Sequence, residues 1–584
     1  MKAELTSSIK EAILAIGKEN NVDLSAIKIH LKENKDKEFG DFSSNIAMIS
    51  SKQLSKNPKD IAGMVIEKLN AIDSIKKIEI AGPGFINFFI KEDSRSLILD
   101  TIYSEGDGFG LKTPKENEER ILIEYVSSNP TGPLHIGHGR GAAFGSVLAS
   151  LLRANGKIVD EEYYVNDYGR QMDILALSVW LRCLELNHLK LKYPKNCYQG
   201  TYVQDIAKTI FADSKVSYLP ETKSLVKALK KDEDPDLLLD EAINIAKKEI
   251  PSAFLAIKTK ALQEILYGIK EDLKEFGVNH NLWFNESSLF EKQEGKNKIE
   301  KALDILSAKN FIYEKEGATW FKSEAFGDDK DRVITRGNDN TTYFASDISY
   351  HLDKYERDYD RIINIWGSDH HGYLPRVKAS IEALGKNQDK LEVVFIQFAN
   401  LLRSGKKVSM STREGEFITL KELIKEVGSE ATRFFYINRK GDQHLDFDLD
   451  LAKEQSKDNP LYYIQYAHAR ICSVFKKLNK KQEFDKEKAK ENSYLLNADK
   501  ELDLQKKLSA FPEIIERAGK NLEPHTLCYY LKDLASLFHS YYNDEKIISE
   551  NLELMQSRLL LINATRQVLK NGLNILGISA PESM

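Results

Sequence analysis

The sequence predicts an α/β protein with an additional all-α part, and three observations support this fold class. Between residues 120 and 400, apolar runs of strand length alternate with helix-length segments, which is typical of parallel βαβ units. After about residue 450 only helical patterns remain. Hydrophobic residues make up 42% of the 584 residues, enough for the cores of about three to four domains. We therefore expect a Rossmann-type parallel-sheet domain, a small α/β N-terminal domain and a C-terminal α-helical bundle.

The small α/β domain is expected at residues 1–115. Apolar residues recur at helical spacing over residues 5–16, and a second helix is predicted at 58–69, with proline in its first turn. Two apolar runs within residues 78–90, separated by Gly-Pro-Gly, predict a β-hairpin. The polar, glycine-rich residues 105–119 are expected to form a linker.

The Rossmann-type domain is expected at residues 116–450 and the bundle at 451–584. A charged helical stretch at about 186–280 is expected to be an insertion between two halves of the sheet. Strands are predicted at 121–126, 157–165, 361–367 and 393–398, and helices between them at 137–156 and 377–385. The bundle helices are predicted at 459–478, 524–542 and 557–577.

The composition excludes several classes of protein. A net charge of −5 excludes a globally basic nucleic-acid binder, although local basic patches remain compatible with one. No apolar run reaches the roughly 18–20 residues of a membrane span, and the charged N-terminal segment differs from a signal peptide. The four cysteines include no CxxC pair, which argues against a disulfide scaffold and a zinc site. We expect a cytoplasmic protein with no structural metal.

The strongest chemical signal is SSNPTGPLHIGHGRGAA at residues 127–143, which follows a predicted strand and begins a helix. The free N–H groups and the dipole of a helix N-terminus favour phosphate. His135 and His138 share one helical face, and Gly137 leaves room for a flat base against the backbone. Two imidazole donors could stabilise the charge that develops during a displacement at phosphorus.

Two other interpretations of this segment remain open. An HxxH pair alone is more often two surface histidines. Gly137, Gly139 and Ala142 also satisfy G-x-G-x-x-A, the dinucleotide-binding fingerprint. That fingerprint requires glycines close to the strand, whereas a spacer with two prolines separates them here. A P-loop enzyme is not supported, because the sequence has no GxxxxGK[ST].

PLHIGH resembles the HIGH signature of class I aminoacyl-tRNA synthetases, and EEYYVNDYGRQM at residues 161–172 narrows the resemblance to the arginyl-tRNA synthetases. The resemblance covers essentially the whole chain, including FGDFSSNIAM at 39–48 and NPLYYIQYAHARI at 459–471. It implies an enzyme that activates L-arginine with ATP and transfers it to the 3′-terminal adenosine of tRNA(Arg). The carboxylate of arginine is the nucleophile, so catalysis consists of positioning and charge stabilisation.

The same resemblance implies further properties. Activation generally requires bound tRNA, Mg²⁺ arrives with ATP, and the enzyme is a monomer. The N-terminal domain contacts the body of the tRNA, and the C-terminal bundle contacts the anticodon. Two alternatives remain: a class I ligase for another amino acid, or a tRNA-binding paralogue without catalysis. Asp347 and the NDYGRQ segment disfavour a ligase for a neutral amino acid, because a neutral side chain would not suit a buried carboxylate. The intact HIGH segment disfavours the paralogue.

The second class I signature, Lys-Met-Ser-Lys-Ser, corresponds to GKKVSMSTREG at residues 405–415. Met410 and Ser411 match it, whereas Ser409 and Thr412 replace both lysines. A basic, glycine-flanked loop of this kind can close over a triphosphate. The cations available in the loop are Lys406, Lys407 and Arg413. The residues expected to act in catalysis are His135, Gly137, His138, Lys407, Met410, Ser411 and Arg413.

The segment WGSDHHGY at residues 366–373 follows a predicted strand. The resemblance places it near the nucleotide, where a carboxylate can accept hydrogen bonds from the ribose. Its adjacent histidines could instead indicate a metal, but no cluster with zinc spacing supports one. The ATP-binding residues that the resemblance implies are Asn129, Pro130, His135, Gly137, His138, Gly367, Asp369, His370, Val408 and Met410.

The amino-acid pocket must recognise a guanidinium, which presents five N–H donors in a planar fork and therefore needs acceptors. Tyr343 and Asp347 lie four residues apart and would share a helical face. The resemblance implies these arginine-binding residues: Asn129, Asn166, Asp167, Gln171, Glu286, Tyr343 and Asp347. Any one of them could instead be an ordinary cap, salt-bridge partner or surface residue.

Anticodon binding is expected on one helix of the bundle. Aromatic side chains can stack on unpaired bases, and arginine can bind phosphate. The candidates are Tyr462, Tyr463, Tyr466 and Arg470. The alternative is a helix that buries its tyrosines among its neighbours.

Overall fold

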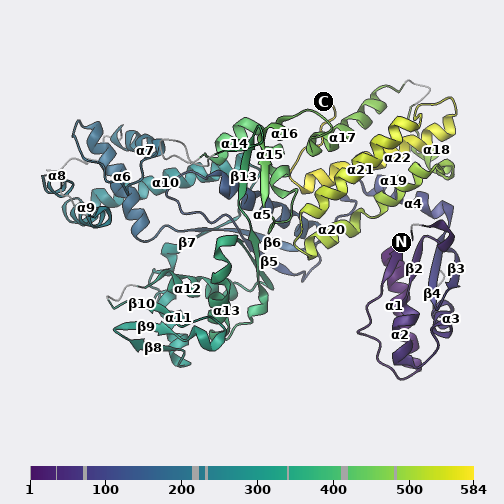
Figure 1. The fold of residues 1–584 in the computed structure, drawn as a ribbon, viewed down its shortest axis with the longest axis horizontal. Coiled ribbons are helices and arrows are strands. Elements are labelled where there is room, and N and C mark those ends of the chain that lie inside the picture. The colour runs from purple at the N-terminus through teal and green to yellow at the C-terminus, as the bar shows by residue number, and fades with distance from the viewer. Residues whose placement is uncertain are drawn as a thin grey trace. The chain divides into compact units, whose positions relative to one another are not determined.

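The computed structural model describes residues 2–34, 36–69, 75–212, 223–230, 234–337, 341–408, 418–478 and 483–584. Its elements are labelled in Figure 1. The chain divides into two compact units. Unit 1 comprises residues 1–109, 470–511 and 536–568, and unit 2 comprises residues 110–469, 512–535 and 569–584. No helix in the described ranges is long and apolar enough to cross a membrane.

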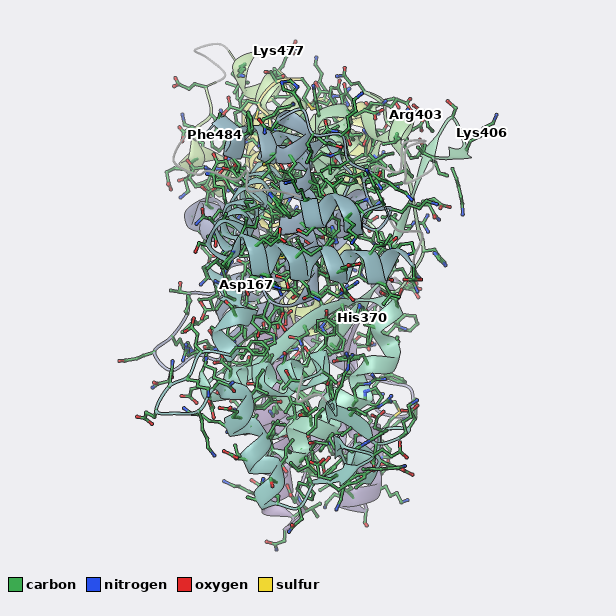
Figure 2. The ribbon with its side chains drawn as sticks, turned by 90° about the vertical axis from the view of Figure 1, so that its left-hand side faces the viewer. Asp167, His370, Arg403, Lys406, Lys477 and Phe484 are labelled. Atoms are coloured by element: carbon green, nitrogen blue, oxygen red, sulfur yellow. The ribbon has the colours of Figure 1, made fainter. Side chains whose placement is uncertain are left out.

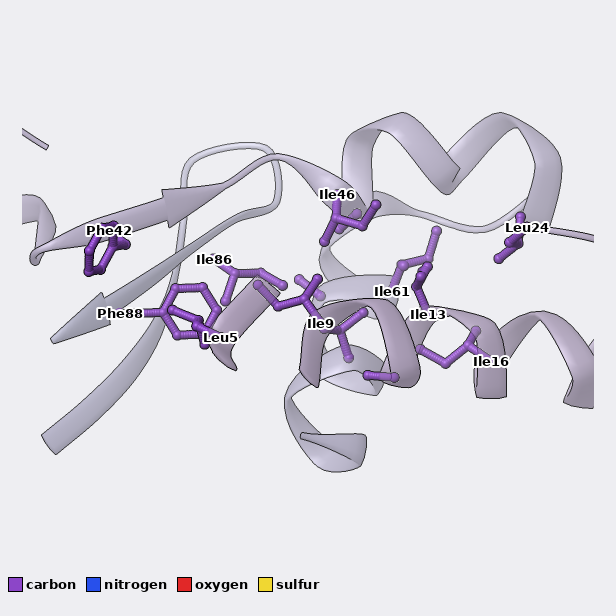
Figure 3. Packing of buried hydrophobic residues seen from close by; sticks show 14 of the residues in the cluster. Leu5, Ile9, Ile13, Ile16, Leu24, Phe42, Ile46, Ile61, Ile86 and Phe88 are labelled. Carbon is purple, nitrogen blue, oxygen red and sulfur yellow. The ribbon is translucent and has the colours of Figure 1, made fainter. Parts of the chain in front are cut away.

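The N-terminal part of unit 1 is an antiparallel sheet packed against helices. The strand order is β1 (Leu31–Glu33), β2 (Phe42–Ser44), β4 (Phe85–Ile90), β3 (Ile75–Ala81), and the helices are α1 (Lys2–Glu19), α2 (Ile46–Leu54) and α3 (Pro58–Lys68). The predicted hairpin and both predicted helices are confirmed. Leu5, Ile9 and Ile13 share the buried face of α1, and Figure 3 shows them in one core with Ile86 and Phe88.

Unit 2 contains the predicted parallel sheet. The strand order is β12 (Leu391–Ile396), β11 (Arg361–Gly367), β5 (Arg120–Glu124), β6 (Ile158–Val165), β7 (Leu282–Asn285), and every neighbouring pair is parallel. The central strand β5 is a continuous buried apolar run, as expected for a strand covered on both faces. The chain proceeds from β5 to β6 on one side and later returns to β11 on the other. Such a reversal is a topological switch point, where α/β sheets bind ligands at the carboxyl ends of their strands.

Helices occupy the part of the chain between β6 and β7, where the sequence predicted a charged helical stretch. Between β6 and β7 the chain forms α6 (Arg170–Leu186), α7 (Thr201–Ala212), α8 (Lys223–Ala228), α9 (Pro235–Glu249) and α10 (Pro251–Glu275). Figure 1 shows these helices gathered at one end of unit 2. The predicted helix at 137–156 is α5 (Ile136–Ala154), and the one at 377–385 is α13 (Leu374–Ala383).

Two small sheets were not expected from the sequence pattern. One is antiparallel, with the order β10 (Arg332–Thr335), β9 (Ala318–Phe321), β8 (Ile312–Lys315). The other joins β14 (Lys406–Lys407), β13 (Ala399–Arg403) and β15 (Leu445–Asp448). Their strands have two to five residues and all except β9 carry charges, so they lack the apolar run that marks β5.

Helices account for the described chain from residue 449 onwards, as predicted. The main ones are α17 (Pro460–Lys476), α19 (Asp499–Ser509), α20 (Phe511–Lys520), α21 (His525–Asp544) and α22 (Leu552–Ile575). Unit 2 also contains α14 (Leu420–Val427) and α15 (Ser429–Ile437). Arg433 of α15 is buried and donates to Ser146 Oγ (2.8 Å), Phe276 O (2.9 Å) and Leu576 O (3.1 Å). One guanidinium thereby joins three distant segments.

Candidate active site

Most of the predicted site residues follow the carboxyl ends of the parallel strands. The HIGH segment follows β5, Asn166 and Asp167 follow β6, Glu286 follows β7, and residues 367–370 close β11. Asp347 belongs to α12 (Tyr343–Glu356), which precedes β11. Figure 2 views the molecule from the side of the insertion and labels Asp167 and His370. We call the ends of β5, β11 and β12 the nucleotide side, and α12 with the ends of β6 and β7 the arginine side.

The HIGH segment forms the N-terminus of α5. His135 is the N-cap, and its Nδ1 accepts a hydrogen bond from Gly137 N–H (3.0 Å). His138 Nδ1 accepts from His135 N–H (3.3 Å), and the two rings stack with centroids 3.7 Å apart. Because both Nδ1 atoms are acceptors, the proton of each neutral ring is on Nε2. The segment therefore presents two oriented N–H donors at a helix N-terminus.

Burial keeps both histidines neutral. It lowers the pKa of His135 and lowers that of His138 to about 3, with a smaller contribution from the neighbouring His135. A phosphate beside the rings would oppose this shift, because a nearby anion favours the charged imidazolium. A β-carbon at Gly137 would lie 2.8 Å from the His135 ring, so a larger residue here would displace that ring.

The segment after the second signature loop pairs with the HIGH segment. Ile136 N–H donates to Ile418 O (3.2 Å), and Leu420 N–H donates to Leu134 O (2.8 Å). On the other flank, Val408 N–H donates to Leu401 O (2.9 Å), and Lys407 is exposed. Met410, Ser411 and Arg413, which the sequence analysis also assigns to this loop, lie outside the described residues.

The end of β11 completes the nucleotide side. Asp369 and His370 are exposed, with His370 Nε2 3.5 Å from Asp369 Oδ2. Ser368 Oγ donates to Gln397 Oε1 (2.9 Å), which joins this turn to the end of β12.

Phe398 was missed in the sequence. It is 48% exposed, and β-carbons built at Gly137 and Gly367 would lie 3.5 and 3.6 Å from its ring. An exposed ring beside two glycines is a suitable surface for a flat base. Buried Arg140 of α5 donates to Gln397 O (2.7 Å) and so fixes this strand end. The available signal was an aromatic residue at the end of the predicted strand 393–398.

The arginine side gathers carboxylates. Asp347 lies on α12 and accepts a hydrogen bond from the Tyr373 hydroxyl. Burial raises the pKa of Asp347 to about 6, and the Tyr373 hydrogen bond opposes that shift. Tyr373, the last residue of WGSDHHGY, was not assigned to this pocket from the sequence. Tyr343 begins the same helix but is 60% exposed, so the two residues do not share one environment.

Glu286 is a second carboxyl on this side whose pKa is raised. It is 3% exposed and hydrogen-bonds to Ser346 and Tyr164. Burial, together with the charge of Asp347, raises the pKa of Glu286 to about 7. A buried acid of this kind gains its charge most easily when a cation enters, and guanidinium is such a cation.

Three residues of the β6 end were also predicted here. Asn166 lies 2.6 Å from Glu286 Oε2 and 3.1 Å from Asn129 Oδ1, so it connects both sides of the site. Asp167 accepts from Ser287 N–H (2.8 Å) and Ser287 Oγ–H (2.7 Å), which holds β7 to the β6 end. Gln171 is partly exposed in the first turn of α6. Pro130 is buried and Asn129 is exposed at the mouth of the site.

The predicted anticodon residues lie on α17. Tyr462, Tyr463 and Tyr466 are partly exposed, and the rings of Tyr462 and Tyr466 stack in parallel with centroids 6.0 Å apart. Tyr462 lines a cavity of about 410 Å³ in unit 2. Arg470, in unit 1, lies 4.6 Å from the centre of the Tyr542 ring.

Comparisons with known proteins agree with this arrangement. The Arginyl tRNA synthetase N terminal domain matches residues 3–90, the catalytic domain of tRNA synthetases class I (R) matches 101–448, and the DALR anticodon binding domain matches 464–584. An Arginine--tRNA ligase of Acinetobacter baylyi is 48% identical over 572 residues, 95% of each chain. One of Legionella pneumophila is 46% identical over 592 residues, all of each chain.

Solved structures show the same likeness. A crystal structure described as an arginyl-tRNA synthetase of Campylobacter jejuni is 32% identical, with a TM-score of 0.71, and covers 85% of this chain and 100% of that one. The arginyl-tRNA synthetase of Thermus thermophilus is 20% identical, with a TM-score of 0.73 over all of both chains, and shows the shared fold. The chain therefore belongs to the arginyl-tRNA synthetases, class I enzymes that join arginine to tRNA using ATP.

Proposed function

We propose that the arginine side and the nucleotide side together form arginyl-adenylate. Glu286 and Asp347 bind the guanidinium, assisted by Tyr343, Asp167 and Gln171. Asn129 and Asn166 hold the other end of the amino acid, its α-amino and carboxylate groups. The observation that carries the proposal is the cluster of carboxyls with raised pKa values beside a helix N-terminus that carries two imidazole donors.

The chemistry is a displacement at the α-phosphorus of ATP. The arginine carboxylate forms the new P–O bond, and the bond to pyrophosphate breaks. His135 and His138 donate Nε2–H to the phosphate oxygens as charge develops, while Gly137, Pro130, Gly367, Asp369 and His370 position adenosine. Mg²⁺ comes with ATP and neutralises its phosphates; carboxylate and phosphate oxygens suit it.

The second signature loop supplies a cation to the leaving pyrophosphate. Lys407 and Arg413 are proposed for this role, with Met410, Ser411 and Val408 shaping the loop. Its anchor at Leu134 and Ile136 supports the assignment, because it brings residue 418 against the HIGH segment. If one of these two cations acts on the pyrophosphate, only its own alanine variant, Lys407→Ala or Arg413→Ala, should slow pyrophosphate release.

The other regions bind the tRNA. Residues 1–115 contact its body, and residues 451–584 contact the anticodon through Tyr462, Tyr463, Tyr466 and Arg470. The catalytic region is 116–450, with the insertion at about 186–280. The enzyme acts in the cytoplasm as a monomer, and activation requires bound tRNA. The partly exposed, stacked tyrosines of α17 support the anticodon contact.

The decisive experiment is ATP–pyrophosphate exchange with each of the twenty amino acids, with and without total tRNA. We expect exchange with arginine only, and only when tRNA is present. Exchange with another amino acid would overturn the pocket assignment. No exchange in either condition would favour the paralogue without catalysis, and exchange without tRNA would contradict the tRNA requirement.

A further inference from the structure

We propose that the buried ion pair of Lys354 and Glu124 fixes the separation of the two ends of the arginine pocket, so that the enzyme selects the length of its amino acid. The inference rests on the assignment of Asn129 and Asp347 to opposite ends of that pocket. Lys354 and Glu124 are positioning residues, because they act through the residues that bind the substrate.

Lys354 lies on α12 and is 0% exposed. Its Nζ donates to Glu124 Oε2 of β5 (2.5 Å) and to Asn364 Oδ1 of β11 (2.8 Å), and it lies 4.4 Å from the centre of the Tyr350 ring. Burying an ammonium is unfavourable unless its partners are complete, and an apolar side chain of similar volume often stabilises such a position as well or better. Packing alone therefore does not require this ion pair. Its effect is to hold α12, β5 and β11 in a fixed geometry.

One arm of this network leads to Asn129. Glu124 Oε1 accepts from Ser127 Oγ–H (2.9 Å), and Ser127 Oγ accepts from Tyr164 N–H (3.1 Å). Ser127 N–H donates to Tyr125 O (3.0 Å) around Val126, whose φ is +69°. This is a γ-turn with positive φ, a rare conformation, and unfavourable for a β-branched residue. Asn129 follows the turn within the same loop.

The strained turn is held from several directions. His280 Nε2 lies 3.2 Å from Tyr125 O, and Tyr163 OH donates to Ser128 O (2.9 Å). A strained backbone persists only where its surroundings over-determine it, and such sites often serve function. The turn therefore depends on its partners, and Glu124 is the partner that connects it to α12.

The other arm leads to Asp347. Asn364 Nδ2–H points to His351 Nε2 (3.3 Å), and His351 Nδ1 lies 2.8 Å from Asp347 O. Burial lowers the pKa of His351 to about 3, so the ring is neutral, accepting at Nε2 and donating from Nδ1. Lys354 thus holds the turn of α12 that carries Asp347 as well as the turn that precedes Asn129.

A pocket whose two ends are fixed can reject an amino acid that is one methylene too long. In a hydrophobic pocket, one methylene is worth about 10–200-fold in kcat/KM. The measurement is the ratio of kcat/KM for arginine to that for homoarginine, in tRNA-dependent ATP–pyrophosphate exchange. The variant is Lys354→Met with Glu124→Gln, which removes both charges and keeps the volumes. We expect this ratio to fall about tenfold.

A purely structural role would lower the activity on both substrates equally and leave the ratio unchanged, so an unchanged ratio in the folded variant overturns the inference. Ser127→Ala removes only the hydroxyl between Glu124 and the turn, and it should also lower the ratio. This second variant keeps the test valid if the double variant fails to fold. The matched control is Arg361→Met with Glu392→Gln, a pair at the amino ends of β11 and β12 (2.7 Å), which should leave the ratio unchanged.

Asp347→Asn, measured in parallel, separates this inference from the proposed function. If Asp347→Asn leaves the KM for arginine unchanged, the pocket assignment fails and the inference fails with it. If Asp347→Asn weakens arginine use while the double variant keeps the wild-type ratio, only the role of the Lys354–Glu124 pair is overturned.

Discussion

Burial favours the neutral form of ionisable groups on both the nucleotide side and the arginine side, but it shifts their pKa values in opposite directions. On the nucleotide side, burial lowers the pKa values of His135 and His138, so both are neutral. On the arginine side, burial raises the pKa values of Glu286 and Asp347, which favours their neutral forms. On each side, a ligand of opposite charge therefore makes the charged form easier to reach. The substrates therefore complete the charge pattern of this site.

The largest loss of activity is expected from a substitution on the arginine side. Asp347→Asn keeps the shape of the side chain but removes the charge opposite the guanidinium, and losing one partner of a desolvated charge pair costs about 2–5 kcal/mol. We expect kcat/KM for arginine to fall about 10³-fold, with the KM for ATP unchanged. Steady-state exchange kinetics measure this. Asp353→Asn on the same helix, whose carboxylate pairs with Lys298 (2.5 Å), is the control and should behave as wild type.

The corresponding change on the nucleotide side is His138→Ala. Loss of one oriented donor to the developing phosphate charge should slow arginine activation about 10²–10³-fold, with little change in fold; His135→Ala should do the same. Exchange at saturating arginine and ATP measures the rate, and circular dichroism checks the fold. The exposed His444→Ala is the control. Wild-type rates in both variants would remove the imidazoles from catalysis.

Arginine binding should depend on pH through Glu286. Below pH 7 Glu286 is mostly protonated, because its pKa is about 7, while the guanidinium stays positive. Arginine should therefore bind more tightly as the pH rises, about tenfold between pH 6 and pH 8. Isothermal titration calorimetry with tRNA present measures the dissociation constant. Glu286→Gln should weaken binding and abolish the step near pH 7; a step that persists in the variant would belong to another group.

The smallest effect concerns stability without ligand. The pKa of Glu286 is about 7 in the folded state against an ordinary value of 4.5, so the folded state binds the proton more tightly. The free energy of unfolding therefore falls as the pH rises from about 4.5 through 7, by roughly 1–3 kcal/mol.

Glu286→Gln should remove this fall in the free energy of unfolding, because glutamine does not ionise. Its thermal midpoint should exceed that of wild type by about 1–4 °C at pH 8, and the difference should shrink towards pH 5. Differential scanning calorimetry at the two pH values measures it. Glu356→Gln, at an exposed position on α12, should show no such pH-dependent gain. A variant less stable than wild type at pH 8 would contradict the predicted cost of ionised Glu286 to stability.

The sequence predicts those parts of the molecule whose signal is local. Strand β5 is a continuous apolar run, and α5 begins at a histidine-glycine segment with a recognisable pattern, so both were predicted near their observed bounds. Strands β8, β9 and β10 were not, because four residues with charges among them carry too little periodicity. These strands exist because they pair with one another, and pairing between distant segments is not visible in a local pattern.

The site shows the same division. Asn166, Glu286 and Asp347 were predicted through the resemblance to a family. The structure places Asn166 and Glu286 at the ends of β6 and β7, and Asp347 on α12, where its charge acts on Glu286. Phe398 and Tyr373 were missed because nothing in their spacing shows which way they point. Lys354 did leave a signal: it follows Asp347 by seven residues and His351 by three, a polar stripe along the buried face of a helix.

Arg433 has a consequence for the synthesis of the protein. Its guanidinium is satisfied partly by Leu576 O, which lies 143 residues further along the chain. Until those residues leave the ribosome, a buried cation on α15 lacks one of its acceptors, and an unsatisfied buried donor is costly. A chain that breaks off between the two residues cannot finish this core.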